Sequence, residues 1–319
     1  MLAFRLFFST FSGMETQGTT QKSRQTVLIS GCSSGFGLLT AVGAAQAGYD
    51  VIATMRNLNK AEPLKTALAQ ANVTARIEEL DITKPESIDR LVEKVGPVDI
   101  LINNAGILIT GSFLDITNQE MRQVFETNYF GQVHLTRSVA QGMIKRKRGR
   151  IINIASLAGR IGHPFNAAYA ASKHALIGFT KSIRVELAPF GIDVISIEPG
   201  YHKTEMIRAN ANQSENFYDR SSPMFEWNRG FLKAFMDEII PRAARPEAVT
   251  KKILAAMAAE KPKVHYVIGL DAKFATTVRW LGLSAWLEGK IYRKIRQARR
   301  LENKREAEKK NRRKQKSLQ

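Results

Sequence analysis

The sequence predicts an α/β domain built around a parallel, doubly wound sheet. Short apolar runs alternate with helical patterns along the chain, and each run is continuous, as in strands that are buried on both faces. A glycine-rich turn directly follows the first run. The expected strands are residues 25–30, 50–55, 76–80, 98–102, 149–155 and 192–198.

Two of the expected helices carry start signals. Thr83 and Glu86 form a capping-box pattern with a proline in the first turn, and Thr117 and Glu120 form a second one. The second box opens a long helix that is expected to end near residue 145.

Composition and length fit one folded domain and exclude several classes of protein. Of the 319 residues, 44% are hydrophobic, which is enough for a sizeable core and too much for a disordered chain. Cys32 is the single cysteine, so an internal disulfide framework and a zinc site of several cysteines are excluded. We expect one domain over residues 24–270, with an irregular substrate lid at about 200–240.

The two ends of the chain differ from this domain. Residues 1–23 are expected to be a flexible leader, with an upstream start before Met14 or a weak targeting segment as alternatives. Residues 271–319 are expected to form an amphipathic and then highly basic helical extension. The net charge of +19 is concentrated there, because residues 290–319 hold 14 Lys/Arg against 3 Asp/Glu.

The extension raises the question of a partner and a location. No run reaches the roughly 20 apolar residues that span a bilayer, so we expect a cytoplasmic protein, with membrane association as an alternative. Residues 273–296 mix Trp, Phe, Leu and Ile with basic residues, which suits an anionic membrane surface or packing over the substrate cleft. Residues 297–319 have no aromatic residue, so specific nucleic-acid binding is not expected.

The turn after the first strand has the composition of a phosphate-binding loop. It reads Ser30-Gly-Cys-Ser-Ser-Gly-Phe-Gly37 and opens a helix. Its glycines allow a tight turn and a close approach to a pyrophosphate, which then faces the free N–H groups of the helix N-terminus. The candidate contacts are Gly31, Ser33, Ser34, Gly35, Phe36 and Gly37.

The end of the second strand predicts the nucleotide. An acidic residue there would accept hydrogen bonds from the ribose 2′-hydroxyl of NAD, but the chain has Met55 followed by Arg56. A cation suits a 2′-phosphate. NADP(H) is therefore the expected cofactor, NAD remains possible, and a solvated surface arginine is the alternative interpretation of Arg56.

Four polar side chains are candidates for catalysis. Asn128 falls on the apolar face of its helix, and Ser156 ends an apolar strand. Tyr169 and Lys173 share a helix face, and an ammonium near a phenol lowers the pKa of the phenol and improves it as a proton donor and acceptor. Each has a structural alternative. Asn128 would then be bonded only to backbone, Ser156 would be a capping residue, and the spacing of Tyr169 and Lys173 would be a chance match.

Together these residues resemble the short-chain dehydrogenase/reductase family over residues 25 to about 205. The resemblance implies a Rossmann-type fold and further site residues. It is carried by the Gly31/Gly35/Gly37 loop, Asp81, Asn104 within Asn103–Gly106, Asn128, Ser156, Tyr169 with Lys173, and Pro199-Gly200 with Thr204.

The roles follow from that resemblance. Tyr169 would be the general acid/base, Lys173 would lower its pKa and bind the nicotinamide ribose, and Ser156 would orient the substrate carbonyl. Asn128 would support a water-linked proton path. Asp81 would contact adenine, while Thr204, with Pro199 and Gly200 before it, would contact the carboxamide region. The chain departs from the family at Ser30, where threonine is usual, and at His202, where an aliphatic residue is usual.

The segments around residues 125–131 and 169–175 look most like the branch with 17β-hydroxysteroid and retinol dehydrogenases. This implies hydride transfer between NADP(H) and a hydrophobic alcohol/ketone or aldehyde that is steroid-, retinoid- or lipid-like. The alternative is a catalytically idle nucleotide-binding protein anchored by its basic C-terminus. The family also implies a homodimer or tetramer formed through the two long helices, here about 118–145 and 167–188.

The substrate side is expected to be apolar. Residues 161–166 precede Tyr169 and are expected to line the same pocket. Further apolar contacts are expected from Met206, Phe217, Tyr218, Met224, Phe225, Trp227 and Phe231.

Overall fold

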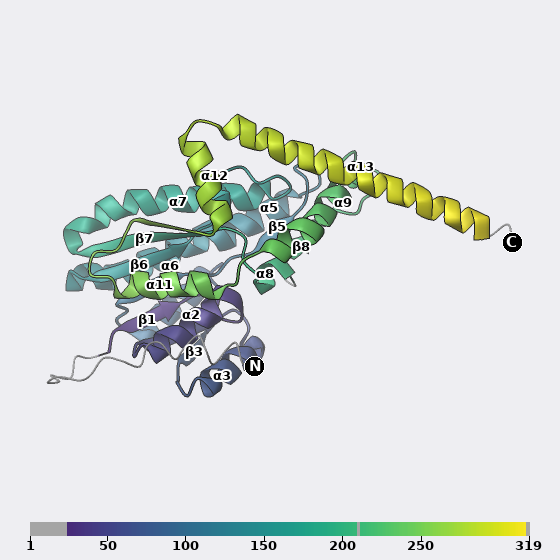
Figure 1. Cartoon of the computed structure of the whole chain (residues 1–319). Coiled ribbons are helices and arrows are strands. Elements are labelled where there is room, and N and C mark those ends of the chain that lie inside the picture. Colours follow the sequence, from purple (N-terminus) through teal and green to yellow (C-terminus); the bar gives the residue numbers. More distant parts are fainter. Residues whose placement is uncertain (1–23, 209–210, 317–319) are drawn as a thin grey trace.

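The computed structural model of the chain describes residues 24–208 and 211–316, so the expected leader lies outside the described residues. Its centre is a parallel sheet of seven strands in the order β3-β2-β1-β4-β6-β7-β9 (Figure 1). The chain moves outward from β1 to β3 and then crosses back to β4, which leaves a ligand-binding crevice at the carboxyl ends of β1 and β4. The strands are β1 (Thr26–Ile29), β2 (Asp50–Met55), β3 (Arg76–Glu79), β4 (Ile100–Asn103), β6 (Gly149–Ile154), β7 (Ile192–Pro199) and β9 (His265–Ile268).

Helices cover both faces of the sheet, as the continuous apolar strands predict. On β1, Val27 and Ile29 pack into one buried cluster and Leu28 packs into the other, because successive side chains of a strand point to opposite faces. One face is covered by α2 (Gly35–Gln46), α3 (Glu62–Gln70) and α11 (Glu247–Ala258). The other is covered by α4 (Pro85–Val95), α6 (Gly131–Arg146) and α7 (Ala167–Leu187), with α5 (Asn118–Phe125) beside α7.

The helix starts differ from expectation at one place. The Thr117–Glu120 capping box is confirmed, since Glu120 N–H donates to Thr117 Oγ1 at 3.2 Å and Thr117 N–H donates to Glu120 Oε2 at 2.8 Å. The box at Thr83 is wrong: α4 begins at Pro85, and the Thr83 hydroxyl donates to Asp81 Oδ1 at 2.7 Å instead. The long helix continues to residue 146 as expected, but a π-helical turn over Glu126–Phe130 interrupts it.

Three strands lie outside the expected set. The edge strand β9 pairs with β7, and a separate pair joins β5 (Leu108–Thr110) to β8 (Ala211–Gln213). β9 lies at the edge of the sheet, and three of its four residues are only partly buried. An edge strand therefore needs no continuous apolar run. The short helix α8 (Glu205–Arg208) precedes β8.

The C-terminal third packs onto the domain. α9 (Phe225–Ala234) is followed by a π-helical turn over Phe235–Ile239 and by α10 (Ile240–Arg242). After β9 come α12 (Leu270–Trp280) and α13 (Ser284–Lys316). α13 crosses α9 so closely that a Cβ on Gly230 would lie 2.9 Å from Arg299 Cα, and beyond this crossing it extends away from the body (Figure 1). The first part of the expected extension is therefore part of the folded body.

Candidate active site

A cavity of about 750 Å³ opens at the carboxyl ends of the strands and continues to α9 and α13. Nearly all the predicted site residues lie in its wall. These are Gly31, Ser33, Ser34, Gly35, Phe36, Arg56, Asp81, Asn104, Ser156, Tyr169, Lys173, Pro199, Gly200 and Thr204. Gly37 and Asn128 are not among the residues that line the described cavity and lie behind it.

The glycine-rich loop is held in a rigid turn. Gly31 and Gly35 have φ values of +77° and +58°, and a Cβ on Gly31 would lie 2.8 Å from Ala105 Cα. Asn104 Nδ2 donates to the carbonyl oxygens of Ser30 and Gly31, at 2.9 Å each. A Cβ on Gly37 would lie 2.5 Å from that amide nitrogen, so Gly37 permits close packing rather than contacting a ligand.

Ser30 joins the glycine-rich loop to the residues that follow β4. Its Oγ accepts the backbone N–H groups of Asn104 and Ala105, at 3.0 Å each, and so joins the loop to the end of β4. The Ser30 departure leaves this connection intact. The resulting cradle, with hydroxyls at Ser33 and Ser34 and the N-terminus of α2 behind them, fits a pyrophosphate.

Two cations border the cavity at the end of β2. Arg56 is exposed there, and Lys60, which the sequence analysis missed, lines the same region. Lys60 ends a short 3₁₀ turn, Leu58–Lys60, that follows Arg56 in the chain. Asp81, expected near adenine, is held by Thr83, whose backbone N–H donates to its Oδ1 at 3.0 Å.

Tyr169 and Lys173 meet Ser156 as predicted. The Lys173 ammonium lies 5.8 Å from the centroid of the Tyr169 ring and donates to the Ile154 carbonyl oxygen at 2.9 Å. Ser156 follows β6, and its Oγ accepts the Ala158 N–H at 3.1 Å. The helix spacing places phenol and ammonium on one face, and the parallel sheet delivers the serine hydroxyl opposite them.

The electrostatics of the pair differ from the expectation in direction. Burial raises the pKa of Tyr169 above its usual 10, and a hydrogen bond with Ser156 offsets this only in part. Burial also lowers the pKa of Lys173 to about 8. The expected lowering of the phenol pKa by Lys173 is therefore wrong for the protein alone, because desolvation of both groups dominates.

Asn128 supports the site from the π-helical turn. It is fully buried; its Oδ1 accepts the Ile107 N–H at 2.8 Å, and its Nδ2 donates to the Ile107 carbonyl oxygen at 3.0 Å. Asn128 is thus bonded to backbone, as the structural alternative expects, and its catalytic role stays a prediction. A Cβ on Gly106 would lie 3.2 Å from Asn128 Oδ1 and 3.7 Å from Lys173 Nζ, so the two polar groups border the same small space.

A second polar group lines the cavity with Tyr169: His163 lies within the expected residues 161–166, but the sequence analysis missed its partner Tyr201. His163 Nε2 is hydrogen-bonded to the Tyr201 hydroxyl. Asn166 orients the imidazole by donating from Nδ2 to His163 Nδ1 at 3.0 Å, and its own Oδ1 accepts the Thr110 hydroxyl at 2.9 Å. Burial, Asp271 and Tyr169 raise the pKa of Tyr201. Because 38 residues separate the two partners, no local pattern signals the pair.

His202 has a packing role in the structure. It is 1% exposed, its ring meets Phe36 edge-on with centroids 5.9 Å apart, and its Nδ1 lies 3.0 Å from the Gly200 carbonyl oxygen. Thr204 remains beside the loop, since a Cβ on Gly35 would lie 3.6 Å from Thr204 Cβ. The unusual histidine therefore leaves the expected threonine in place.

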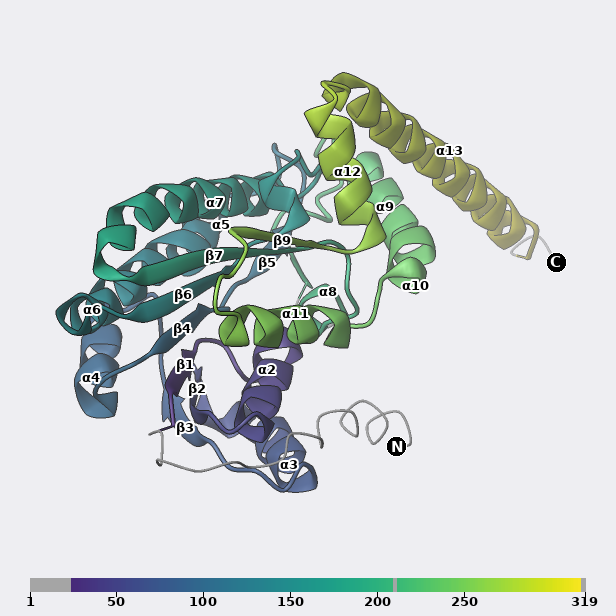
Figure 2. The ribbon, with the colours of Figure 1, turned by 60° about the vertical axis from the view of Figure 1, so that its left-hand side comes forward.

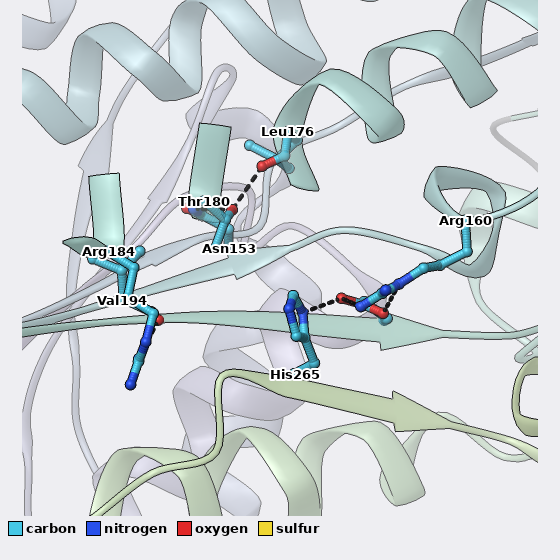
Figure 3. Close-up of polar contacts among 8 residues, drawn as sticks. Asn153, Arg160, Leu176, Thr180, Arg184, Val194 and His265 are labelled. Atoms are coloured by element: carbon cyan, nitrogen blue, oxygen red, sulfur yellow. Dashed lines mark hydrogen bonds and ion pairs between the residues drawn. The ribbon is translucent and has the colours of Figure 1, made fainter. Parts of the chain in front are cut away.

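A buried ion cluster braces the segment that follows Ser156. Arg160 donates to both carboxylate oxygens of Glu198, at 2.7 and 2.8 Å, and His265 Nδ1 approaches the same carboxylate at 2.8 Å (Figure 3). Burial alone would raise the pKa of Glu198, but the bonds to His265 and Arg160 outweigh it and lower the pKa to about 2. Nearby, Asn153 donates to Thr180 at 2.8 Å and joins β6 to α7 (Figure 3).

The far end of the cavity is mainly apolar. Of the seven apolar residues predicted for it, Met206 and Phe231 line it, whereas the remaining five do not and Phe217 is fully buried in packing. Residues 161–166 contribute as expected, except that Phe165 stacks behind Phe231 with centroids 4.5 Å apart. Phe235, Glu238 and Ile239 also line this end, from the expected lid although they were not named individually. Ile291, Lys294 and Ile295 come from residues 273–296, where the alternative of packing over the substrate cleft is what the structure shows.

Comparison with known proteins agrees with this geometry. The family model described as "short chain dehydrogenase" matches residues 25–215. Retinol dehydrogenase 8 of Homo sapiens is 43% identical over 57% of this chain and 60% of its own length. An uncharacterized oxidoreductase of Escherichia coli K12, YbbO, is 32% identical over 88% of this chain and 96% of its own.

Solved structures show the same architecture. A short-chain dehydrogenase from Streptomyces avermitilis superposes with a TM-score of 0.72 at 31% identity, covering 85% of this chain and 98% of that one. An actinorhodin polyketide ketoreductase variant with NADPH has a TM-score of 0.61 at 32% identity, covering 73% of this chain and 89% of that one.

Proposed function

The chain belongs to the short-chain dehydrogenase family of NAD(P)-dependent oxidoreductases, and from this we propose that it interconverts a hydrophobic alcohol with its ketone or aldehyde, using NADP(H). One observation carries the proposal. Ser156, Tyr169 and the buried Lys173 lie in one cavity with the glycine-rich cradle at one end and apolar walls at the other.

The cradle residues support the cofactor. Gly31 and Gly35 would admit the pyrophosphate against the N-terminus of α2, and Asp81 would meet the adenine. Arg56 and Lys60 provide positive charge where a 2′-phosphate would lie, which favours NADP(H) over NAD(H). When bound, the nicotinamide supplies or accepts the hydride at the substrate carbon.

The chain's own groups manage the proton. In reduction, Ser156 Oγ donates a hydrogen bond to the substrate oxygen, and the Tyr169 hydroxyl gives its proton to that oxygen as negative charge develops. A raised phenol pKa keeps Tyr169 protonated for this step. Lys173, with Asn128 across the space at Gly106, would return a proton to the phenolate. Oxidation uses the same groups in reverse.

The substrate end supports a sizeable apolar molecule. Phe231, Phe235, Ile291 and Ile295 come from α9, the π-helical turn after it and α13, and together form an apolar wall. The similarity to retinol dehydrogenase 8 and to a polyketide ketoreductase supports a steroid-, retinoid- or lipid-like alcohol or carbonyl. An ion pair also borders that end, with Lys294 Nζ 3.1 Å from Glu238 Oε2.

NADPH absorbance tests the proposal. The wild-type enzyme is followed at neutral pH with steroid, retinoid and long-chain ketones and aldehydes, beside NADH and a Tyr169→Phe control. Turnover that prefers NADPH and disappears in the control is expected. Preference for NADH would overturn the role of Arg56 alone. Tight NADPH binding without turnover across the panel would instead favour the catalytically idle binding protein.

A further inference from the structure

The turn between α12 and α13 presents large apolar side chains to solvent. On α12, the buried face carries the smaller residues Ala272, Ala275 and Val278. The large residues face outward, and they include Leu270 at 87% exposed and Trp280 at 83%. The exposed face of an amphipathic helix is normally polar, so these exposed apolar side chains are unusual. We call the surface at the turn the α12–α13 corner; it comprises Phe274, Trp280, Leu281, Leu283 and Trp286.

The corner is a fixed feature of the fold. Ala272 and Ala275 pack on Leu157, directly after Ser156, and so anchor α12 to the core. Gly282, at φ +74°, turns the chain back into α13, and the Phe274 and Trp286 rings lie with centroids 6.4 Å apart across the turn. Figure 2 shows the corner projecting from the body, away from α2 and α3.

Basic residues surround the apolar side chains. Residues 270–296 contain six Lys/Arg and two acids, Asp271 and Glu288. Asp271 accepts the Tyr201 N–H at 2.7 Å and so is engaged with the core. Lys290 Nζ lies 4.1 Å from the centroid of the Trp286 ring. Exposed tryptophan and leucine beside lysine and arginine match the interface of a bilayer that carries anionic lipid.

We propose that the α12–α13 corner docks on the surface of an anionic lipid bilayer. Within the described ranges, no helix is long and apolar enough to cross a membrane, so the contact is one of lying on the surface. The same α13 lines the substrate cavity through Ile291 and Ile295, which lie about one and a half and two and a half turns beyond Trp286. Docking would therefore place the apolar end of the cavity next to lipid. The proposal does not depend on which substrate is turned over.

Vesicle sedimentation of the full chain tests the proposal. Phosphatidylcholine vesicles are compared with vesicles that contain about 30% phosphatidylglycerol, which supplies the anionic charge. The wild-type chain should bind the anionic vesicles at least about tenfold more tightly, since each basic residue near the surface contributes about fivefold. Tryptophan emission should shift to shorter wavelength on binding, and Trp280→Phe should reduce that shift, with the remainder coming from Trp286.

A matched pair of variants locates the contact. Trp280→Glu and the control Phe113→Glu, in the turn after β5, each replace an aromatic side chain that is at least 75% exposed with a negative charge, so neither should affect folding. Trp280→Glu should lower vesicle binding at least about tenfold, and Phe113→Glu should leave it unchanged, with equal melting temperatures as the check on folding.

Three outcomes would overturn the proposal. Trp280→Glu could bind as well as wild type and lose all binding at high salt, which would assign the binding to the charge of residues 297–319. Neutral and anionic vesicles could both fail to bind. The wild-type chain could be a dimer that Trp280→Glu converts to a monomer, which would show that a second copy covers the corner.

Discussion

The two ends of the cavity are built in different ways. At the cofactor end, each functional group sits at the carboxyl end of a strand or on one face of one helix, so its position follows from local spacing. At the substrate end, the wall is assembled from α9 and α13, which meet only because Gly230 lets Arg299 approach its backbone. The first end is a property of short segments, and the second is a property of packing between distant ones.

Lys173→Met should give the largest effect and should break the cofactor end without unfolding it. We expect turnover to fall at least about 100-fold, because the proton relay through Tyr169 is lost. Burial holds the pKa of Lys173 at about 8, below its unfolded value, so the charged lysine costs stability at neutral pH. The wild-type chain should therefore gain stability as the pH rises from about 8 to about 10.5, and the variant should not; chemical denaturation across that range measures both.

Glu198→Gln tests the ion cluster that braces the Ser156 segment. The pKa of Glu198 falls to about 2, so its ionised form should contribute about 3 kcal/mol above the unfolded pKa of 4.5. This contribution should be lost as the pH falls from about 4.5 to about 2. The variant should be destabilised at pH 7 and show a smaller acid dependence; an unchanged denaturation midpoint would contradict the assignment.

Gly230→Ala should affect the substrate end selectively. The added Cβ would lie 2.9 Å from Arg299 Cα, which must move α13 away from α9 at a cost of about 1–3 kcal/mol. We expect KM to change for large apolar substrates and the dissociation constant of NADPH to stay the same. Gly178→Ala on α7, where a Cβ would meet nothing within 4 Å, is the matched control.

Arg56→Ala should give a modest effect confined to the cofactor. Loss of one charge-assisted contact to a 2′-phosphate should raise the KM for NADPH about tenfold and leave the KM for NADH unchanged. Arg56→Lys should restore most of the difference. An equal rise for both cofactors would show that Arg56 does not contact the phosphate, and Lys60→Ala would then become the variant to test.

How much of the fold could be predicted depends on burial. Five of the six expected runs became strands that are buried by helices on both faces, whereas residues 76–80 became the partly exposed edge strand β3. The run of residues 50–55 matches β2 at both ends. β9 was missed because an edge strand needs no continuous apolar run. The capping box at Thr83 failed because the threonine hydroxyl had a nearer partner in Asp81, which a linear pattern does not show.

The sequence by itself determined the identity and relative placement of the chemical groups. Tyr169 and Lys173 share a face because they are four residues apart, and Gly31, Gly35 and Asn104 lie together because parallel strands end at one edge. Tertiary structure decided their environment. Burial set the direction of both pKa shifts, packing joined His163 to Tyr201, and the approach of α13 to α9 made a basic extension into a cavity wall. Desolvation and long-range contact depend on neighbours from across the chain, and spacing along the chain does not specify those neighbours.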